Sequence, residues 1–475
     1  MTNNNASIAG ILRQRAIQTP DQQAFVFLNN RGTEVATHTY GSLDEKVRKM
    51  AAVIRSETRE KDRVLLLFPP GLEFIEAYFA CMYANVIAVP AYPPRKNAHA
   101  MRIHAIVRNA GAALALTTAN EKSKLERNQA DFPFLQDIPC MAIETDELSE
   151  DHLPTEEVLD LTNALSFLQY TSGSTGDPKG VMVAQDNLIF NLQALQTHTQ
   201  FNQGCSMVSW LPAFHDMGLI YGILLPIFVG NPCYMMAPVT FIANPLLWLR
   251  TIANRRATHA VAPNFAFDLC YKKISPEQLA DLDFSQLRYF ANAAEPIREE
   301  SIQNFASIFP QGNDIASIVS PAYGLAEATL VVSCSGAGEA LHSCSVDLNA
   351  LKDNRVEEVD KDSENAFRLV GSGGIINDTL VRIVRPETGR VCKDGEVGEI
   401  WVQGQTVTKG YWQNEAKTEE IFHAYTSDTE EGPFLRTGDL GFVKQNQLYI
   451  TGRHKDLIII EGANYYPQDI EYTAQ

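Results

Sequence analysis

Short apolar runs and amphipathic helical patterns alternate along the first 143 residues of the chain. Helices are predicted at residues 8–18, 42–55, 71–84 and 99–110. Strands are predicted at residues 64–68, 86–89, 113–117 and 138–143. Because a strand, a helix and a second strand in succession form a parallel βαβ unit, this pattern predicts a doubly wound parallel sheet.

The alternation returns further along the chain and then gives way to β-segments. Strands are predicted at residues 233–236, 258–261, 287–291 and 315–319, and helices at residues 245–256, 264–273 and 297–309. Short segments at residues 379–384, 398–403 and 447–451 are separated by turn residues and predict a small distorted β-barrel. The fold class is therefore α/β, with two stacked, mostly parallel, doubly wound sheets and a small barrel.

Length and composition narrow the class of protein. A chain of 475 residues, 45% apolar and 20% charged, predicts a soluble protein of two or three lobes. The net charge of −18, without a dense basic cluster, argues against a nucleic-acid partner. The eight cysteines form no C-x-x-C pair, and neither a secretory signal nor a long uninterrupted apolar run is visible. We expect a reduced, cytoplasmic monomer with no membrane span.

Hydroxyls, glycines and one lysine gather in residues 169–181, QYTSGSTGDPKGV, between two predicted strands. Gly173 and Gly176 allow backbone N–H groups to turn toward an anion. Side-chain donors are supplied by Thr171, Ser172, Ser174, Thr175 and Lys179. A plain turn has a similar composition. A Walker A loop is disfavoured, because its Gly-Lys-Ser/Thr leads into a helix whereas a strand follows Lys179.

This loop resembles the phosphate loop of the adenylate-forming superfamily, which includes acyl-CoA synthetases, luciferases, peptide-synthetase adenylation domains and fatty acyl-AMP ligases. In that family the loop holds the β- and γ-phosphates of ATP. The resemblance therefore implies that ATP and Mg²⁺ are the cofactors, with Lys179 as a catalytic residue.

Residues 210–219, WLPAFHDMGL, place an imidazole and a carboxylate directly before an apolar helix at residues 219–229. One interpretation is a strand end followed by a helix that Asp216 caps. The other rests on the resemblance, since the His-Asp-Met-Gly spelling is similar to that of fatty acyl-AMP ligases and lies beside the acyl substrate. It implies that His215, Met217 and Gly218 line the acyl pocket and that His215 is catalytic.

Two further motifs, NAAEP at residues 292–296 and PAYGLAEAT at residues 321–329, follow predicted strands. Ligands of open α/β sheets bind at the carboxyl ends of the strands. The resemblance implies an adenine pocket and stacking surface formed by Asn292, Ala293, Ala294, Glu295, Tyr323 and Gly324. It also implies a catalytic, Mg²⁺-binding Glu327, joined by Thr171. The family commonly has Thr where this chain has Ala326, so that hydroxyl is absent.

RTGDLG at residues 436–441 resembles the ribose motif of the family, although a simple turn has the same spelling. A carboxylate suits ribose because it accepts hydrogen bonds from two hydroxyls and donates none. The resemblance implies that Asp439 accepts both ribose hydroxyls, that Arg453 contacts the ribose or α-phosphate, and that Asp456 is a hinge.

The spacing from Glu327 to Gly371 is about twice that of the superfamily, which indicates an insertion near residues 338–365. It could be a long surface loop. In fatty acyl-AMP ligases an insertion here is thought to restrain the C-terminal lid and disfavour transfer to coenzyme A. Residues 457–475 match only the start of that lid, whose roughly one hundred further residues, a domain-sized piece, include the family's adenylation lysine.

The resulting domain prediction is an N-terminal lobe at residues 1–456, with α/β layers near 1–200 and 201–340 and a barrel at 366–455. The predicted function is ATP-dependent conversion of a fatty acid to acyl-AMP and pyrophosphate. An acyl carrier protein is the expected acceptor of the acyl group. Alternatives are a fatty acyl-CoA ligase, an amino-acid adenylation domain and a non-catalytic adenylate binder.

Overall fold

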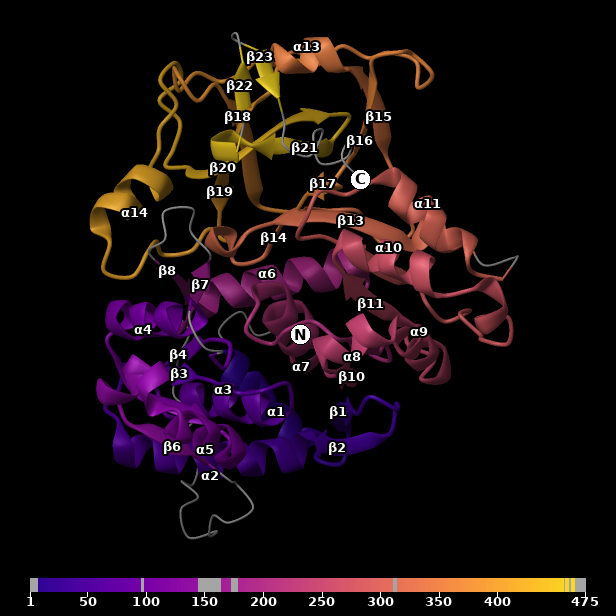
Figure 1. Ribbon diagram of the computed structural model, residues 1–475. Coiled ribbons are helices and arrows are strands. Elements are labelled where there is room, and N and C mark those ends of the chain that lie inside the picture. Colours follow the sequence, from indigo (N-terminus) through magenta and orange to yellow (C-terminus); the bar gives the residue numbers. More distant parts are fainter. Residues whose placement is uncertain are drawn as a thin grey trace. The chain divides into compact units, whose positions relative to one another are not determined.

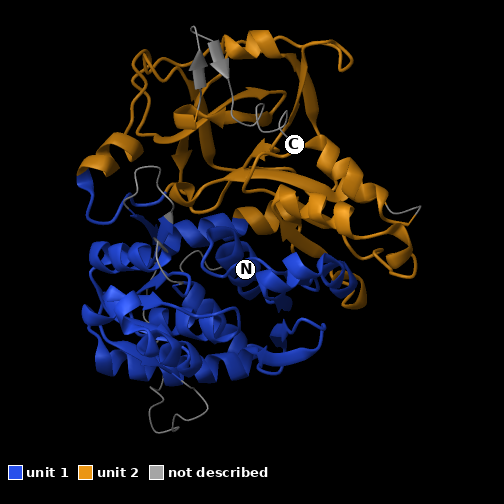
Figure 2. Ribbon diagram, in the orientation of Figure 1, with its two compact units in different colours: residues 1–193, 202–251, 408–415 blue, residues 194–201, 252–407, 416–475 orange. Residues whose placement is uncertain are grey.

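The computed structural model describes residues 7–94, 98–143, 164–171, 178–310 and 314–456, and the backbone of residues 458–460 and 463–465. These residues form two compact units, which Figure 2 distinguishes by colour. Unit 1 comprises residues 1–193, 202–251 and 408–415. Unit 2 comprises residues 194–201, 252–407 and 416–475.

Unit 1 contains a six-stranded sheet with the order β6-β5-β3-β4-β7-β8 (Figure 1). Its strands are β3 (Arg63–Leu66), β4 (Ile87–Pro90), β5 (Ala112–Thr117), β6 (Cys140–Ala142), β7 (Leu165–Thr171) and β8 (Lys179–Ala184). The connecting helices are α3 (Glu73–Tyr83), α4 (Ala98–Ala110), α5 (Ala119–Arg127), η1 (Gln129–Asp131) and η2 (Pro133–Gln136). Every pair is parallel except β7 with β8, so the predicted doubly wound sheet is confirmed.

A second sheet segment of unit 1 has the order β9-β10-β1-β2. Its strands are β1 (Gln23–Leu28), β2 (Glu34–Thr39), β9 (Met207–Ser209) and β10 (Cys233–Met236). The helices that accompany it are α1 (Ile8–Gln18), α2 (Tyr40–Glu57), η5 (Met217–Leu224), α7 (Leu225–Val229) and α8 (Pro238–Ala243). The periodicity did not reveal the β1–β2 hairpin, because four successive β2 residues are exposed and form no apolar face.

Local capping explains where the long helix α2 begins. The Thr39 hydroxyl accepts a hydrogen bond from Ser42 N at 3.2 Å, and Ser42 Oγ accepts one from Thr39 N at 3.0 Å. This reciprocal pair satisfies two N–H groups that a helix start otherwise leaves without partners. The helix then buries Leu43, Val47 and Ile54, which are 0% exposed.

Unit 2 contains the strands β11, β12 and β13, which are parallel, followed by β14 and β17, which pair antiparallel. Their bounds are β11 (His259–Ala262), β12 (Tyr289–Asn292), β13 (Val319–Gly324), β14 (Val331–Cys334) and β17 (Gly374–Ile375). The helices are α6 (Gln185–Thr199) and α9 (Pro245–Asn254), which both begin in unit 1, and α10 (Asn264–Lys273), η6 (Pro276–Gln278), α11 (Glu299–Ser307), α12 (Ile315–Ile318) and η7 (Ala326–Ala328).

The strand predicted at residues 315–319 is wrong, because residues Ile315–Ile318 form the short helix α12. Asp314 begins it by accepting a hydrogen bond from Ser317 N at 3.4 Å. A capping aspartate favours a helical turn even where isoleucine and valine raise β-propensity.

The remaining strands of unit 2 form an open antiparallel sheet with the order β18-β19-β20-β21. They are β18 (Thr379–Val384), β19 (Gly398–Gly404), β20 (Leu435–Lys444) and β21 (Gln447–Arg453). The helix α14 (Glu415–Phe422) precedes β20 in the chain. The strand positions predicted from the sequence are confirmed, but within the described residues the sheet does not close into the expected barrel.

The predicted insertion is structured along much of its length. It contributes β15 (Ser343–Asp347) and α13 (Leu348–Lys352), and β15 pairs antiparallel with β16 (Ala366–Val370). After β21 come η8 (His454–Asp456), β22 (Ile458–Ile460) and β23 (Ala463–Tyr465). The backbone of α13 lies beside that of β23.

No helix in the described parts of the chain is long and apolar enough to cross a membrane. All eight cysteines lie in these parts, and none of them forms a disulfide bond.

Candidate active site

The predicted phosphate loop joins the antiparallel strands β7 and β8, and Thr171 lies directly opposite Lys179 in their register. Ser172, Gly173, Ser174, Thr175 and Gly176 lie outside the described residues, as does the Thr171 side chain. The two strands expected on either side of the loop are confirmed, and Lys179 is the first residue of β8.

Residues 409–412 run along β8 and place an aromatic ring beside Lys179. Met182 N donates to Gly410 O at 2.9 Å, and Trp412 N donates to Gly180 O at 2.8 Å. As a result, Lys179 Nζ lies 5.4 Å from the centroid of the Tyr411 ring. A cation over an aromatic face is attracted by the ring quadrupole, so Tyr411 restricts the lysine. Tyr411 is more than 200 residues away in the sequence, and no local pattern indicates this contact.

His215 and Asp216 form a pair at the start of the π-helix η5. Asp216 Oδ1 lies 2.7 Å from His215 Nδ1 and accepts a hydrogen bond from Met217 N at 2.6 Å. Burial works to lower the pKa of His215, but the hydrogen bond and charge of Asp216 outweigh it and raise that pKa above its usual value. Asp216 therefore caps the helix, as the sequence suggests, and also binds His215. Short π-helices frequently occur at functional sites.

The His215 segment lies close to the end of β7. Gln169 Nε2 donates to Phe214 O at 3.0 Å, which joins it to the residue before His215. Met217 is buried at 6% exposure. Close packing requires glycine at position 218, because a Cβ there would lie 2.0 Å from Pro212 O. The motif thus has half-exposed His215 at its surface, with Met217 and Gly218 packed behind it.

In unit 2, the NAAEP motif follows β12 and has an irregular backbone. Asn292 is 0% exposed, and its Nδ2 donates to Asn264 Oδ1 at 3.2 Å. After Ala293, Ala294 has a φ of 74°, a left-handed conformation that costs energy for a residue with a side chain. Glu295 accepts a hydrogen bond from Phe265 N at the start of α10. The geometry gives Asn292 and Glu295 structural contacts.

Tyr323, Asp439 and Arg453 form a hydrogen-bonded chain across three strands of unit 2. The Tyr323 hydroxyl donates to Asp439 Oδ2 at 2.7 Å, and Arg453 Nε donates to Asp439 Oδ1 at 3.1 Å. Asp439 and Arg453 are direct partners in the β20–β21 register. Burial raises the pKa of Asp439, opposed by Arg453 and Tyr323, and burial followed by the nearby Asp439 charge raises that of Tyr323.

Asp439 keeps acceptor capacity in this chain of contacts. A carboxylate offers about four lone-pair sites, and Tyr323 and Arg453 occupy one on each oxygen. One lone-pair site therefore remains on each oxygen. Two adjacent hydroxyls, such as a ribose diol, match this arrangement.

Glu327 lies on η7, between β13 and an unusual turn. Leu330 N donates to Ala328 O at 2.7 Å, and the intervening Thr329 has φ 66° and ψ −66°. This is a γ-turn with positive φ, which is rare and strained. Gly324 is required beneath it, because a Cβ there would lie 1.6 Å from Leu330 O.

Thr406 holds this turn through reciprocal hydroxyl contacts. Its Oγ1 donates to Ala328 O at 2.6 Å, and Thr329 Oγ1 donates to Thr406 O at 2.7 Å. Thr406 is 0% exposed. It is the second residue, after Tyr411, that the sequence analysis missed.

Comparison with known proteins identifies the family. The profile of the family described as AMP-binding enzyme matches residues 12–412. The chain belongs to this family. A relative from Moorena producens named medium-chain-fatty-acid–[acyl-carrier-protein] ligase is 40% identical over 99% of this chain and 80% of its own. A Mycobacterium marinum relative named 4-hydroxyphenylalkanoate adenylyltransferase is 35% identical over 99% of this chain and 78% of its own.

Solved structures of AMP-binding enzymes match over nearly the whole chain. A fatty acid AMP ligase from Legionella pneumophila has a TM-score of 0.88 and 39% identity, covering 98% of this chain and 80% of its own. A fatty acyl-adenylate ligase from the same organism, in complex with acyl adenylate and pyrophosphate, has a TM-score of 0.86 and 39% identity over the same shares. An adenylation domain of a keto acid-selecting peptide-synthetase module, 23% identical with a TM-score of 0.83, shares the fold.

The donor set of this AMP-binding enzyme suits a Mg²⁺ ion that is shared with the nucleotide. Among the described residues, no group of three His, Cys, Asp or Glu side chains gathers that could hold a metal without further ligands. Mg²⁺ commonly uses one or two carboxylates together with substrate phosphates and water. Glu327 fits that requirement as a single carboxylate at the end of the β13 motif.

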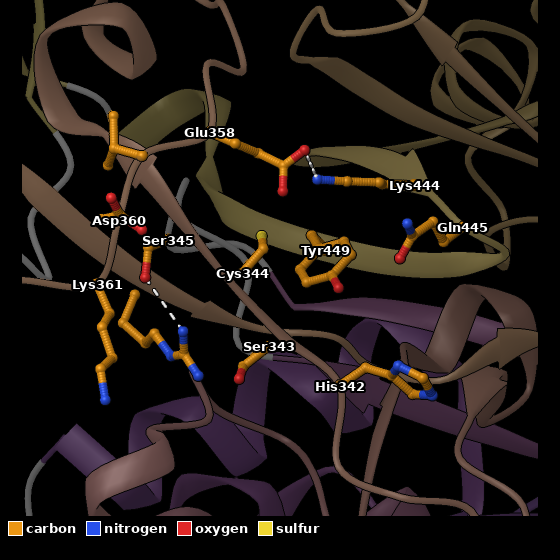
Figure 3. A pocket seen from close by; sticks show the side chains of 12 residues that line it. His342, Ser343, Cys344, Ser345, Glu358, Asp360, Lys361, Lys444, Gln445 and Tyr449 are labelled. Atoms are coloured by element: carbon orange, nitrogen blue, oxygen red, sulfur yellow. Dashed lines mark hydrogen bonds and ion pairs between the residues drawn. The ribbon is translucent and has the colours of Figure 1, made fainter.

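A separate cavity of about 310 Å³ lies in unit 2 between the insertion and the β20–β21 hairpin (Figure 3). Lys444 forms an ion pair with Glu358, and Arg368 contacts Ser345 Oγ at 3.1 Å and Glu299 at 2.6 Å. Among the described residues that line it, none belongs to the predicted site. The Lys444–Glu358 ion pair links the β20–β21 hairpin to the insertion at this cavity.

Proposed function

We propose that this AMP-binding enzyme uses ATP to convert a fatty acid into an acyl-adenylate and pyrophosphate. The observation that carries the proposal is the buried Asp439 carboxylate, held by Tyr323 and Arg453 with capacity left for a ribose diol. Fatty acid as the substrate is supported by relatives of 39–40% identity whose names specify fatty acid ligases. Cysteines without disulfides agree with a cytoplasmic location.

The reaction requires positioning and neutralisation of charge. A carboxylate oxygen of the fatty acid forms a bond to the α-phosphorus, the bond from that phosphorus to the bridging oxygen breaks, and pyrophosphate leaves with the electron pair. In such a displacement the protein contributes alignment and electrostatic stabilisation. Lys179, restricted by Tyr411, would neutralise phosphate oxygens, and Asp439 with Arg453 would hold the nucleoside. Bound Mg²⁺ would neutralise phosphate charge, with Glu327 and Thr171 as its proposed protein ligands.

His215 is proposed to bind the carboxylate end of the fatty acid. Its pKa lies above the usual value, so it keeps more positive charge near neutral pH than a free imidazole. Met217 and the buried residues of η5 supply an apolar surface behind it. This arrangement favours a substrate with an anionic end and an apolar body.

An acyl carrier protein is the proposed acceptor of the acyl group, and the insertion is proposed to disfavour coenzyme A. The first argument comes from the Moorena producens relative, whose name specifies an acyl carrier protein. The second comes from α13 of the insertion, which lies beside β23 just after the proposed hinge Asp456. A restraint at this point would oppose the lid movement that a second half-reaction requires. A monomer is proposed as the oligomeric state.

The proposal is tested by mass spectrometry of the full-length protein incubated with Mg·ATP and a panel of fatty acids. Coenzyme A or a phosphopantetheinylated carrier protein is added in separate reactions. We expect acyl-AMP to persist with coenzyme A and to be consumed by the carrier protein. Acyl-CoA as the main product would assign the protein to the CoA ligases. No adenylate from any acid, with intact AMP binding, would contradict the proposal and favour another carboxylate substrate or a binding role.

A further inference from the structure

The strand that carries Asp439 is interrupted by a β-bulge. Trp401 pairs with Arg436, and Glu399 pairs with Leu440, in the antiparallel register of β19 and β20. Between these pairs β19 has residue 400 alone, whereas β20 has residues 437–439. The two extra residues loop out of the ladder. Bulges of this kind redirect a side chain and are common beside active sites.

The Glu399 carboxylate fills the space that the bulge opens. Its Oε1 accepts a hydrogen bond at 3.1 Å from the backbone N–H of Gly438, the middle residue of the bulge. Its Oε2 accepts from Arg436 Nη2 at 2.9 Å and from Trp401 Nε1 at 2.9 Å. Glu399 is 3% exposed, so these donors replace the water that a carboxylate otherwise needs.

The remaining contacts of the bulge transmit this anchorage to Asp439. Gly438 has a φ of 73°, which glycine adopts without the penalty of a side chain. Thr437 Oγ1 donates to Ile400 O at 2.7 Å and accepts from Asp439 N at 3.0 Å. Thr437 therefore holds the Asp439 backbone directly, and Glu399 holds it through the backbone of Gly438.

We infer that Glu399 is a positioning residue for recognition of the nucleotide's ribose diol. It touches no atom assigned to the nucleotide and acts through the backbone of Gly438 on the direction of the Asp439 carboxylate. The inference rests on the proposed function to the extent that Asp439 binds a ribose. It assigns a role to a residue for which the local sequence, Gly398-Glu-Ile-Trp401, indicates only a β-strand.

The experiment compares binding of AMP and of 2′,3′-dideoxy-AMP by isothermal titration calorimetry. A positioning role predicts that Glu399→Gln weakens AMP binding about tenfold, the low end for a hydrogen bond to a charged group. Binding of the dideoxy nucleotide should change by less than about twofold, because it offers no hydroxyls to Asp439. Glutamine keeps the size of the side chain, but its amide N–H₂ group would face one of the N–H donors that now bind the Glu399 carboxylate.

Glu431→Gln is the matched control, since Glu431 lies in the segment before β20, pairs with Arg382 of β18 at 2.9 Å and has a side chain that is 42% exposed. It should leave both affinities unchanged. Combined with Asp439→Asn, Glu399→Gln should cause no further loss of AMP affinity, as expected for two residues acting on one contact. If Glu399→Gln fails to fold, Glu399→Asp keeps the charge but cannot span both Arg436 and Gly438, and should show the same selective loss.

Equal weakening of both nucleotides by the folded variant would overturn the inference in favour of a general structural role. The inference would also be overturned if Glu399→Gln kept the unmodified protein's preference for AMP over 2′,3′-dideoxy-AMP. The same holds if the unmodified protein bound both nucleotides equally. The binding measurement needs no fatty acid. A protein that binds AMP as described yet makes no acyl-adenylate would therefore contradict the proposed function while leaving this inference intact.

Discussion

Replacing Thr406 by valine should weaken the turn that follows Glu327. The substitution keeps the shape of a side chain that is 0% exposed and removes its hydroxyl. That hydroxyl donates to Ala328 O at 2.6 Å, and Val331 O lies 3.3 Å away. Losing a buried hydrogen bond typically costs about 0.5–1.5 kcal/mol, and Ala328 O keeps the hydrogen bond from Leu330 N.

Strain in the turn reduces the expected loss of stability. Thr329, at φ 66° and ψ −66°, stores about 1–3 kcal/mol of the kind associated with sparsely populated backbone conformations. Once Thr406 no longer holds it, the turn can relax and release part of that strain. The free energy of unfolding should therefore fall by less than about 1 kcal/mol. The relaxation would move Glu327. The apparent affinity for Mg·ATP should therefore fall even though the variant remains folded.

The assay combines urea unfolding with adenylate formation at varied Mg·ATP. Thr406→Ser is the control, because serine retains the hydroxyl, and it should keep at least half of the unmodified activity. The reasoning is refuted if Thr406→Val leaves the Mg·ATP dependence unchanged, or if Thr406→Ser impairs it equally.

Three further predictions address other residues. Asp439→Ala should weaken AMP binding by roughly 1.5–3 kcal/mol in calorimetry, and an unchanged affinity would remove Asp439 from the site. Tyr411→Leu should lower kcat/KM for ATP about threefold, as expected for a cation–π contact of about 0.5–1 kcal/mol, whereas Tyr411→Phe should not; equal loss in both would contradict a role of the ring. Burial lowers the pKa of His259 to about 4, so the unfolded chain, whose histidine has a pKa near 6.5, binds this proton first as the pH falls. The free energy of unfolding should decrease by about 2 kcal/mol between pH 7 and pH 5, and His259→Asn should flatten this dependence in urea titrations; an equal slope in the variant would contradict it.

The sequence predicts helices and strands well where a continuous local run of residues shows one hydrophobic periodicity. The α2 helix and the strands β3 to β5 have continuous apolar patterns, and their positions match to within a few residues. Prediction failed where a partner distant in the sequence decides the structure. The strand β1 is supported by β10, which begins more than 200 residues later.

The candidate site shows the same division. Tyr323, Asp439 and Arg453 were selected as candidate site residues from their motifs, and the structure joins them in one hydrogen-bonded chain. The motifs did not indicate that the Tyr323 hydroxyl binds Asp439, because the two are 116 residues apart. Glu399 and Thr406 were missed, since a glutamate and a threonine in β-rich sequence carry no distinctive pattern.

Glu399 and Thr406 have one property in common, which follows from the geometry of the motifs. Asp439 lies in a β-bulge, and Glu327 precedes a turn with positive φ. Irregular backbone of this kind leaves N–H and C=O groups without ladder partners, and those groups must be satisfied elsewhere. Glu399 accepts the hydrogen bond of Gly438 N, and Thr406 donates a second hydrogen bond to Ala328 O beside that of Leu330 N. A motif that breaks regular structure to aim a functional side chain therefore requires a second buried polar residue from another strand or loop, and a buried polar side chain opposite a backbone irregularity is the place to search for one.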